Sequence, residues 1–235
     1  MSLLSNLKTD SSIQEDKDVL GGGYKAFDSD IYNGIIRYAY LQKANSSNAL
    51  SLNLCVDIDG KEYKETMWIS NRNGENYYEK DGNKNYLPSF TIANHMALFT
   101  CQKELSDLDT EEKVISIYNW DQRKEVPTAV PCITDLHGKK VCLAIMKELV
   151  NKQTKDASGN YVPTDETKEQ NNIVKVFHPE NHKTVVECKA KAEQPEFYEK
   201  WLEKNKGQIK DNTTKSSLSM TNKTNQSKSV SSLFA

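Results

Sequence analysis

Residues 50–70 contain the pattern that most constrains how this chain folds. Within residues 50–58 every second residue is large and apolar, which is the pattern of a strand with one buried face. Asp59-Gly60, a pair typical of a two-residue hairpin turn, follows directly. Residues 61–70 alternate again, so we predict an antiparallel hairpin. Its second strand places Tyr63, Met67 and Ile69 on one side and Lys64, Thr66 and Trp68 on the other.

Other apolar patterns predict further elements along the chain. A helix of about three turns is expected after Pro88, with Ser89 or Thr91 as its cap. A closing helix that packs on the body is expected just before the polar tail. The expected strands are residues 31–41, 114–120 and 141–149, with a further hairpin or two edge strands at 173–177 and 184–190. Propensity alone would also allow a helix at 141–149, but alternate apolar residues favour a strand there. The closing helix is 195–206, and 71–88 and 153–170 are polar loops.

The order of these elements predicts the fold class. Three strands, a helix and two more strands is the order of an oligonucleotide-binding (OB) barrel. We therefore expect a mostly β protein, an OB-fold-like antiparallel barrel with one helix between strands 3 and 4, an extra hairpin and a C-terminal helix. Residues 24–205 form this domain. Residues 1–23 are expected to be a flexible segment, and residues 206–235, rich in Ser, Thr, Asn and Lys, a disordered tail.

Composition excludes several classes of protein but does not point to a partner. The 31 basic and 33 acidic residues give a net charge of −2, so no basic excess indicates nucleic acid. No apolar run approaches the roughly 20 residues of a membrane span, and the first residues do not resemble a secretory signal, so we expect a cytoplasmic protein. The five cysteines are far apart and are expected to be reduced. No cofactor and no metal site are expected.

Aromatic residues beside basic ones are the informative feature for function. A base stacked on an exposed ring contributes roughly 1–3 kcal/mol whatever its identity, provided that cations neutralise the backbone. Three groups fit this description. The first and densest contains Lys64, Trp68, Arg72, Tyr77, Tyr78, Lys80, Lys84 and Tyr86; the second contains Arg37, Tyr38 and Tyr40; the third contains Tyr118, Trp120, Arg123 and Lys124. The alternative is that tyrosines on predicted strands, such as Tyr38, Tyr40, Tyr63 and Tyr118, are half-buried sheet residues.

Two stretches of the chain resemble the single-stranded-DNA-binding proteins that phages encode. Residues 71–78 match the "-NRxGxNYY-" loop of that family, and residues 124–128 match its "-KEVPT-" segment. The resemblance covers roughly residues 30–190. It implies an OB-fold body, sequence-tolerant binding of single-stranded DNA in an infected bacterial cell, and a role in phage replication or recombination. Some relatives also act in viral transcription. Many members end in an acidic tail, whereas this chain has a mildly basic one that ends Leu233-Phe234-Ala235.

Non-enzymatic DNA binding is therefore the predicted function, with two alternatives. The first is a nuclease that holds magnesium with Asp57, Asp59 and Glu65, although acids beside a hairpin turn are common for turn reasons alone. The second is a protein-interaction factor, such as a transcription regulator or host-enzyme inhibitor. The apolar tip of the tail, Leu233 and Phe234, is expected to dock on a replication protein or on a neighbouring copy.

Overall fold

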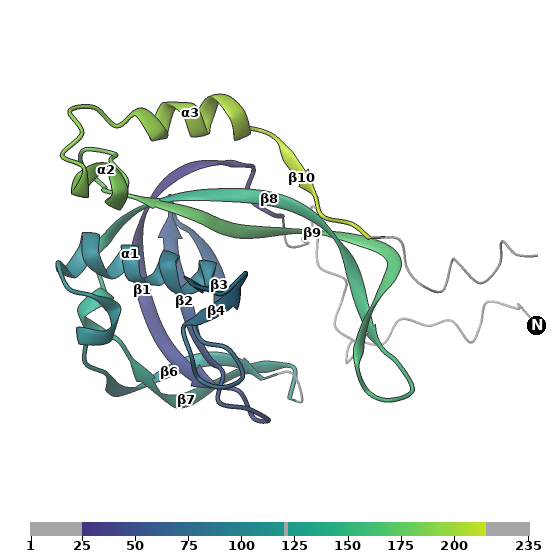
Figure 1. Cartoon of the computed structure of the whole chain (residues 1–235). Helices are drawn as coiled ribbons and strands as arrows, with labels where there is room; N and C mark the ends of the chain where they lie inside the picture. Colours follow the sequence, from purple (N-terminus) through teal and green to yellow (C-terminus); the bar gives the residue numbers. More distant parts are fainter. Residues whose placement is uncertain (1–24, 120–121, 215–235) are drawn as a thin grey trace, which may run out of the picture.

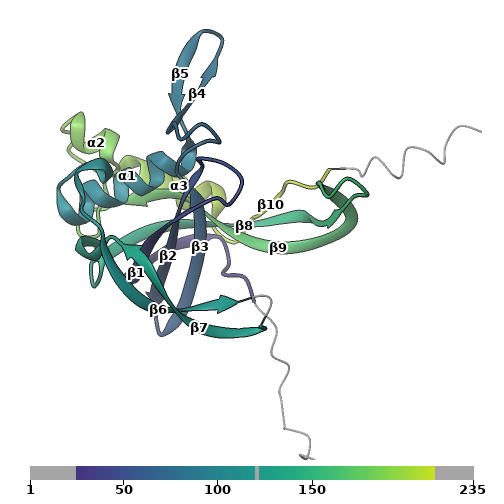
Figure 2. The ribbon, with the colours of Figure 1, turned by 90° about the horizontal axis from the view of Figure 1, so that it is seen from below.

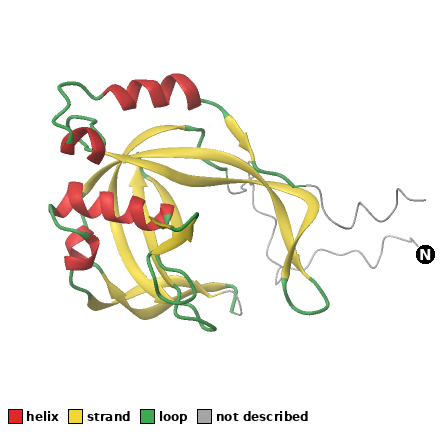
Figure 3. Cartoon of the chain, viewed as in Figure 1, coloured by secondary structure: helices red, strands yellow, loops and turns green. Residues whose placement is uncertain are grey.

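A computed structural model describes residues 25–119 and 122–214 of the chain. Within these residues the protein is mostly β, with one longer helix, two further helices and two short 3-10 turns (Figure 3). The strands are β1 (Asp30–Lys43), β2 (Leu50–Ile58), β3 (Lys61–Trp68), β4 (Tyr77–Lys80), β5 (Asn83–Tyr86), β6 (Glu111–Asn119), β7 (Lys124–Cys132), β8 (Lys140–Lys155), β9 (Tyr161–Phe177) and β10 (Ile209–Asp211). The helices are α1 (Pro88–Cys101), α2 (Val185–Lys189) and α3 (Glu196–Asn205), and the 3-10 turns are η1 (Leu105–Asp107) and η2 (Thr134–Leu136).

Eight of these strands form one sheet, whose main path is β10-β8-β1-β2-β3. β9 pairs with β8, β7 pairs with β1 at a single position, and β6 pairs with β7 (Figure 1). All of these pairs are antiparallel except β10 with β8. In the described residues no backbone ladder joins β3 to β9, so the sheet is not closed. The mostly β antiparallel architecture is confirmed, but the predicted closed barrel is not found.

The hairpin predicted from residues 50–70 is present as β2 and β3. Asp59 and Gly60 form its turn, both with positive φ (51° and 79°), as a two-residue turn of this kind requires. Alternate residues of β2 and β3 enter the main core. This inner face carries Leu52, Leu54, Val56, Ile58, Tyr63 and Met67, whereas Lys64, Thr66 and Trp68 lie on the opposite face, as predicted.

Helix α1 covers the inner face of the sheet and completes the main core (Figure 1). Ile92, Ala93, Met96 and Ala97 are its buried residues. The predicted caps, Ser89 and Thr91, are wrong. Leu87 is the N-cap residue and no side chain caps it; Pro88 opens the helix, because its fixed φ and missing N–H suit that position.

A second, smaller cluster packs the closing helix on the other side of β8. Trp201 of α3 is buried with Phe177 and Cys142, and Tyr198 packs edge-to-face on Phe177 at 5.2 Å between ring centroids. The predicted closing helix is therefore confirmed. Residues 184–190 were expected to form a strand, but they contain α2, because Thr184 and Glu187 form a reciprocal capping box that begins a helix there.

The two polar stretches predicted as loops contain strands. Residues 71–88 include the β4–β5 hairpin, whose Asp81-Gly82 turn repeats the positive-φ pair seen at Asp59-Gly60. Residues 153–170 belong to the far half of a long β8–β9 ribbon that projects beyond the body (Figure 1). A polar ribbon in water lacks the apolar alternation from which a strand is recognised, because neither of its faces is buried.

The domain boundary after residue 205 is also corrected. Gln208 and Gly207 contact Ser29, and Ile209–Asp211 pairs in parallel with β8, so residues 206–214 belong to the fold. The predicted N-terminal segment 1–23 and the tail beyond residue 214 lie outside the described residues. All five cysteines are unpaired, in agreement with the sequence prediction. In the described chain no helix combines the length and apolar character needed to cross a bilayer.

Candidate nucleic-acid interface

The face of β1, β2 and β3 that points away from α1 holds most of the predicted sheet residues in register. We call it the outer face. Tyr40 lies opposite Asn53, and Asn53 lies opposite Thr66, so these three form one row across the strands. Tyr38, Cys55 and Lys64 form the adjacent row. The expected neighbourhood of the first and second aromatic groups is therefore found for Tyr38, Tyr40, Lys64 and Trp68.

Hydrogen bonds join three polar side chains of the outer face, Ser51, Asn53 and Thr66, which we call its polar floor. Thr66 Oγ1 donates to Asn53 Oδ1 at 2.7 Å, and Asn53 Nδ2 donates to Ser51 Oγ at 3.3 Å. Ser51 and Asn53 are buried although they do not face the main core. Neither residue was predicted as part of the site, although polar residues that alternate with leucines on β2 were the available signal.

The β6–β7 hairpin borders the outer face and converts it into a groove. The hollow between them has a volume of about 310 Å³, and we call it the sheet groove. β6 and β7 pair with each other along their full length, and β7 joins the body at Tyr40 and Cys132 (Figure 2). The side chains that define the groove are Tyr38, Tyr40, Lys64, Thr66, Tyr118 and Glu125.

The aromatic rings of this region differ in how far they are available for stacking. Tyr40 is only 7% exposed, so it is the half-buried sheet residue of the alternative interpretation. Tyr38 is partly buried, with its ring centroid 6.1 Å from that of Tyr40, and burial raises its pKa strongly. Tyr118 and Trp68 are 45% and 49% exposed. These two residues therefore offer the most accessible rings at the groove and its margin.

The cations of the outer face are already paired with carboxylates. Arg37 lies 3.1 Å from Glu62 and 3.7 Å from Asp57, and Lys64 lies 2.9 Å from Glu62 and 4.0 Å from Glu125. The hydrogen bond to Glu62 raises the pKa of Lys64, and the same contact lowers the pKa of Glu62. A phosphate entering here must compete with acidic side chains, so the groove is aromatic without being strongly basic.

The β4–β5 hairpin carries the densest predicted cluster, but it does not line the sheet groove. It projects from the body away from β6 and β7 (Figure 2). Tyr77 pairs with Tyr86 on one side of the hairpin, while Tyr78 and Lys80 point to the other side. Lys84 Nζ lies 2.9 Å from Tyr77 Oη and 4.2 Å from the ring centroid. The cluster is thus divided between two faces.

The remaining predicted residues occupy loops and turns. Arg72 is exposed in the loop before β4. Arg123 has a positive φ of 53° in the turn before β7, and Lys124 opens that strand opposite Asn119. Trp120, Leu233 and Phe234 lie outside the described residues.

The three carboxylates of the nuclease alternative do not come together. Asp57 lies on the outer face beside Arg37, and its Oδ1 accepts the Gly60 N–H in the hairpin turn. Glu65 instead accepts hydrogen bonds from the Tyr63 hydroxyl and from the Ile173 N–H. Among residues 25–119 and 122–214, no group of three or more His, Cys, Asp or Glu side chains is arranged to hold a metal ion.

No protein-family model matches the chain, and no curated protein matches it in sequence.

Proposed function

We propose that this protein binds single-stranded DNA through the sheet groove, in the manner of an OB-type phage protein, without catalysing a reaction. The observation that carries the proposal is the outer face itself. It places the exposed ring of Tyr118 and the partly buried ring of Tyr38 around a polar floor, and the exposed ring of Trp68 lies beside the groove, opposite Ser51 of β2. The family resemblance of residues 30–190 points to the same function, in phage replication or recombination.

Stacking explains how such a groove binds without reading sequence. Every base presents a π face, so an exposed tryptophan or tyrosine ring contributes roughly 1–3 kcal/mol per stacked base. Asn53 and Thr66 supply hydrogen-bonding groups between the rings, and these are held in place by their mutual 2.7 Å bond. An unpaired strand can splay its bases into a hollow of this size, whereas the stacked bases of a duplex are not available.

The paired cations predict a weak dependence on salt. Each phosphate neutralised on a single strand contributes about 0.7 to the slope of log affinity against log salt. Arg37 and Lys64 are the cations of the outer face, and both are engaged by Glu62. We therefore expect a slope smaller than that of proteins whose DNA grooves are lined by unpaired lysines.

A titration of fluorescent oligonucleotides tests the proposal. The full chain should bind a 30-nucleotide oligothymidylate and bind a duplex of the same length much more weakly. Trp68→Leu and Tyr118→Leu should each reduce affinity about 5- to 150-fold, which corresponds to roughly 1–3 kcal/mol. Tyr161→Leu is the matched control, because Tyr161 is 66% exposed on the β8–β9 ribbon and does not line the groove. No binding by the unmodified chain, or equal losses in all three variants, would reject the proposal.

One observation favours the second candidate, a protein-interaction factor. A hollow of about 590 Å³ at the β4 side of the body is more apolar than the sheet groove, and it is lined by Leu41, Leu50, Ile69, Phe90, Leu105 and Ile133 among others. Apolar hollows of this kind accept side chains of partner proteins. If the oligonucleotide titration fails, this surface is the next to test.

A further inference from the structure

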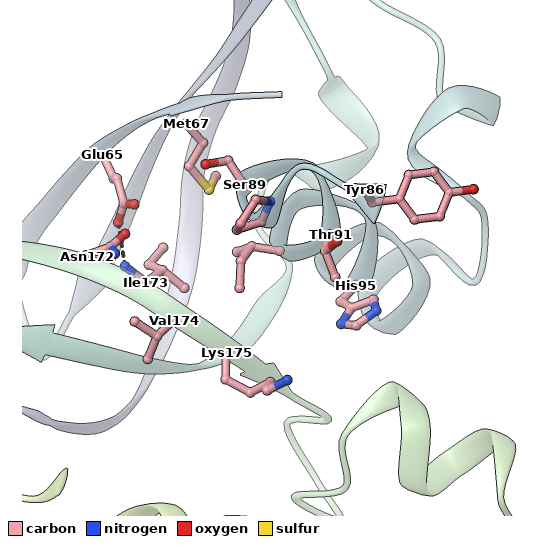
Figure 4. Close-up of a pocket in the computed structure, with 12 residues that line it drawn as sticks. Glu65, Met67, Tyr86, Ser89, Thr91, His95, Asn172, Ile173, Val174 and Lys175 are labelled. Atoms are coloured by element: carbon pink, nitrogen blue, oxygen red, sulfur yellow. Dashed lines mark hydrogen bonds between the residues drawn. The ribbon is translucent and has the colours of Figure 1, made fainter. Parts of the chain in front are cut away.

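A second groove runs along α1 on the other side of β3. Two hollows, of about 420 and 410 Å³, share Tyr86, Thr91 and His95 in their walls and therefore lie side by side along α1. One end opens between β3 and β9, and the other reaches Lys189 of α2. We call the combined hollow the α1 groove. Figure 4 shows its first half, with His95 and Lys175 directed toward the same space beside α1.

The α1 groove meets the sheet groove at the edge of β3. Glu65 lines both of them. Here the sheet is open, and the Glu65 side chain takes the place of a backbone ladder by accepting the Ile173 N–H of β9 at 3.0 Å. A linear ligand that leaves the sheet groove over this edge therefore enters the α1 groove next.

The polar chemistry of the α1 groove suits an anion. Lys175 and Lys189 stand at its two halves, and neither forms an ion pair with any other residue that the structure describes. The Nδ1 atom of His95 between them is buried and has no hydrogen-bond partner among the same residues. Burial and then the charges of the two lysines lower the pKa of His95, against the opposing effect of the Glu104 carboxylate, which also lines the groove. A buried N–H at Nδ1 without an acceptor is costly, and an oxygen of an anionic ligand would accept that N–H and relieve the cost.

An aromatic platform lies at the rim of the same groove. Tyr86 is 64% exposed, the largest exposed fraction of any tyrosine on the α1 side of the body. Its ring is held against Phe90, with 5.2 Å between the centroids. A preorganised exposed ring beside cations is what stacking of a base next to its phosphate requires.

We propose that the α1 groove binds nucleotides, with the phosphate at Lys175, His95 and Lys189 and the base on Tyr86, so that a DNA strand leaving the sheet groove continues along α1. The path from the sheet groove into the α1 groove rests on the proposed function. Binding of a single nucleotide in the α1 groove does not rest on it, so the two proposals can be tested separately.

The first test measures the salt dependence of oligonucleotide binding. Lys175→Gln combined with Lys189→Gln should lower the slope of log affinity against log salt by about 0.7, because the one phosphate that both lysines contact is no longer neutralised. The control is Lys168→Gln combined with Lys204→Gln, which makes the same change in net charge at exposed positions outside both grooves. A slope change no larger than that of the control would overturn the path from the sheet groove into the α1 groove.

The second test uses thymidine monophosphate and inorganic phosphate, with the His95 imidazole observed by NMR in the full chain. Both ligands should shift the His95 resonances and raise its pKa. Tyr86→Leu should weaken the monophosphate and leave inorganic phosphate unchanged. If the chain binds no oligonucleotide but His95 responds to the monophosphate, the proposed function fails and the nucleotide site stands. If His95 responds to neither ligand, the nucleotide site is wrong.

Discussion

Thr66 Oγ1 donates a 2.7 Å hydrogen bond to Oδ1 of Asn53, its directly opposed neighbour on β2. This bond fixes the orientation of the Asn53 amide. Its Oδ1 accepts from Thr66, and its Nδ2 points toward Ser51, to which it donates. A polar pair at the centre of the outer face therefore has a structural role as well as a place in the proposed interface.

Thr66→Val is expected to destabilise the fold by about 0.5–1.5 kcal/mol, since it keeps the side-chain shape but leaves a buried acceptor without its donor. The free energy of unfolding in urea measures this loss. Thr128→Val is the control, because the Thr128 hydroxyl is exposed and, among the described residues, bonds only to Val126 O two residues earlier. Equal losses in both variants would show that the Thr66–Asn53 bond contributes nothing specific.

Trp68→Ala is expected to weaken single-stranded-DNA binding more than Tyr78→Ala. Trp68 lies on the outer face beside the sheet groove, whereas Tyr78 lies on the projecting β4–β5 hairpin, which does not line the groove. The expected loss for Trp68 is roughly 1–3 kcal/mol, the contribution of one stacked base. Anisotropy titrations of both variants check this order, and a larger loss for Tyr78 would move the interface to the hairpin.

Glu65→Gln is expected to flatten the pH dependence of stability. Burial raises the pKa of Glu65, so the folded state binds this proton more tightly than the unfolded state does. Stability is therefore lost as the pH rises from the ordinary value near 4.5 through the raised folded value. The variant is neutral throughout and its amide oxygen still accepts the Ile173 N–H.

The measurement for Glu65 is a series of denaturation curves between about pH 4 and pH 8. The variant should match the unmodified chain at the acidic end and exceed it increasingly toward neutral pH. Parallel curves across the range would mean that Glu65 ionises in the folded protein as it does in the unfolded chain.

Gly34→Ala is expected to destabilise the protein by about 1–3 kcal/mol through overpacking. A Cβ at this position of β1 would lie 2.5 Å from Val56 Cγ1 and 2.8 Å from the Asp57 carbonyl oxygen. Thermal denaturation checks the loss. The neighbouring Asn33→Ala is the control, since its side chain is exposed and its removal should change stability by less than about 0.5 kcal/mol.

The sequence was sufficient where a buried face imposes a period. Alternation in residues 50–70 predicts the β2–β3 hairpin and the outward direction of Trp68. A shift of the pairing by one residue would expose every leucine of β2 to solvent, so the apolar pattern determines the register. It was insufficient where no such face exists, as in the β8–β9 ribbon. At residues 184–190, β-branched Val185 and Val186 suggested a strand, and the local capping box outweighed them.

Parts of the site depend on registers that no local pattern contains. Arg37 faces Asp57 and Glu62 only because a bulge between Ile36 and Tyr38 shifts the pairing of β1 with β2. Its neutralisation was therefore not predictable from residue types. Similarly, nothing in the sequence pattern of α1 distinguishes His95. Its buried, unpaired Nδ1 and the nearby charges of Lys175 on β9 and Lys189 on α2 follow from the tertiary fold.

The short strand β10 also determines where the chain can be shortened. It covers the edge of β8 at Lys147–Leu149, immediately beyond the point where β1 ends its own pairing at Asp30 and Ile145. A chain cut at residue 205, the boundary that composition suggests, loses this cover and leaves N–H and C=O groups of β8 unpaired. Such an edge recruits the same edge of another molecule. The shortened protein should therefore self-associate and precipitate at concentrations at which a chain ending at residue 214 stays monodisperse.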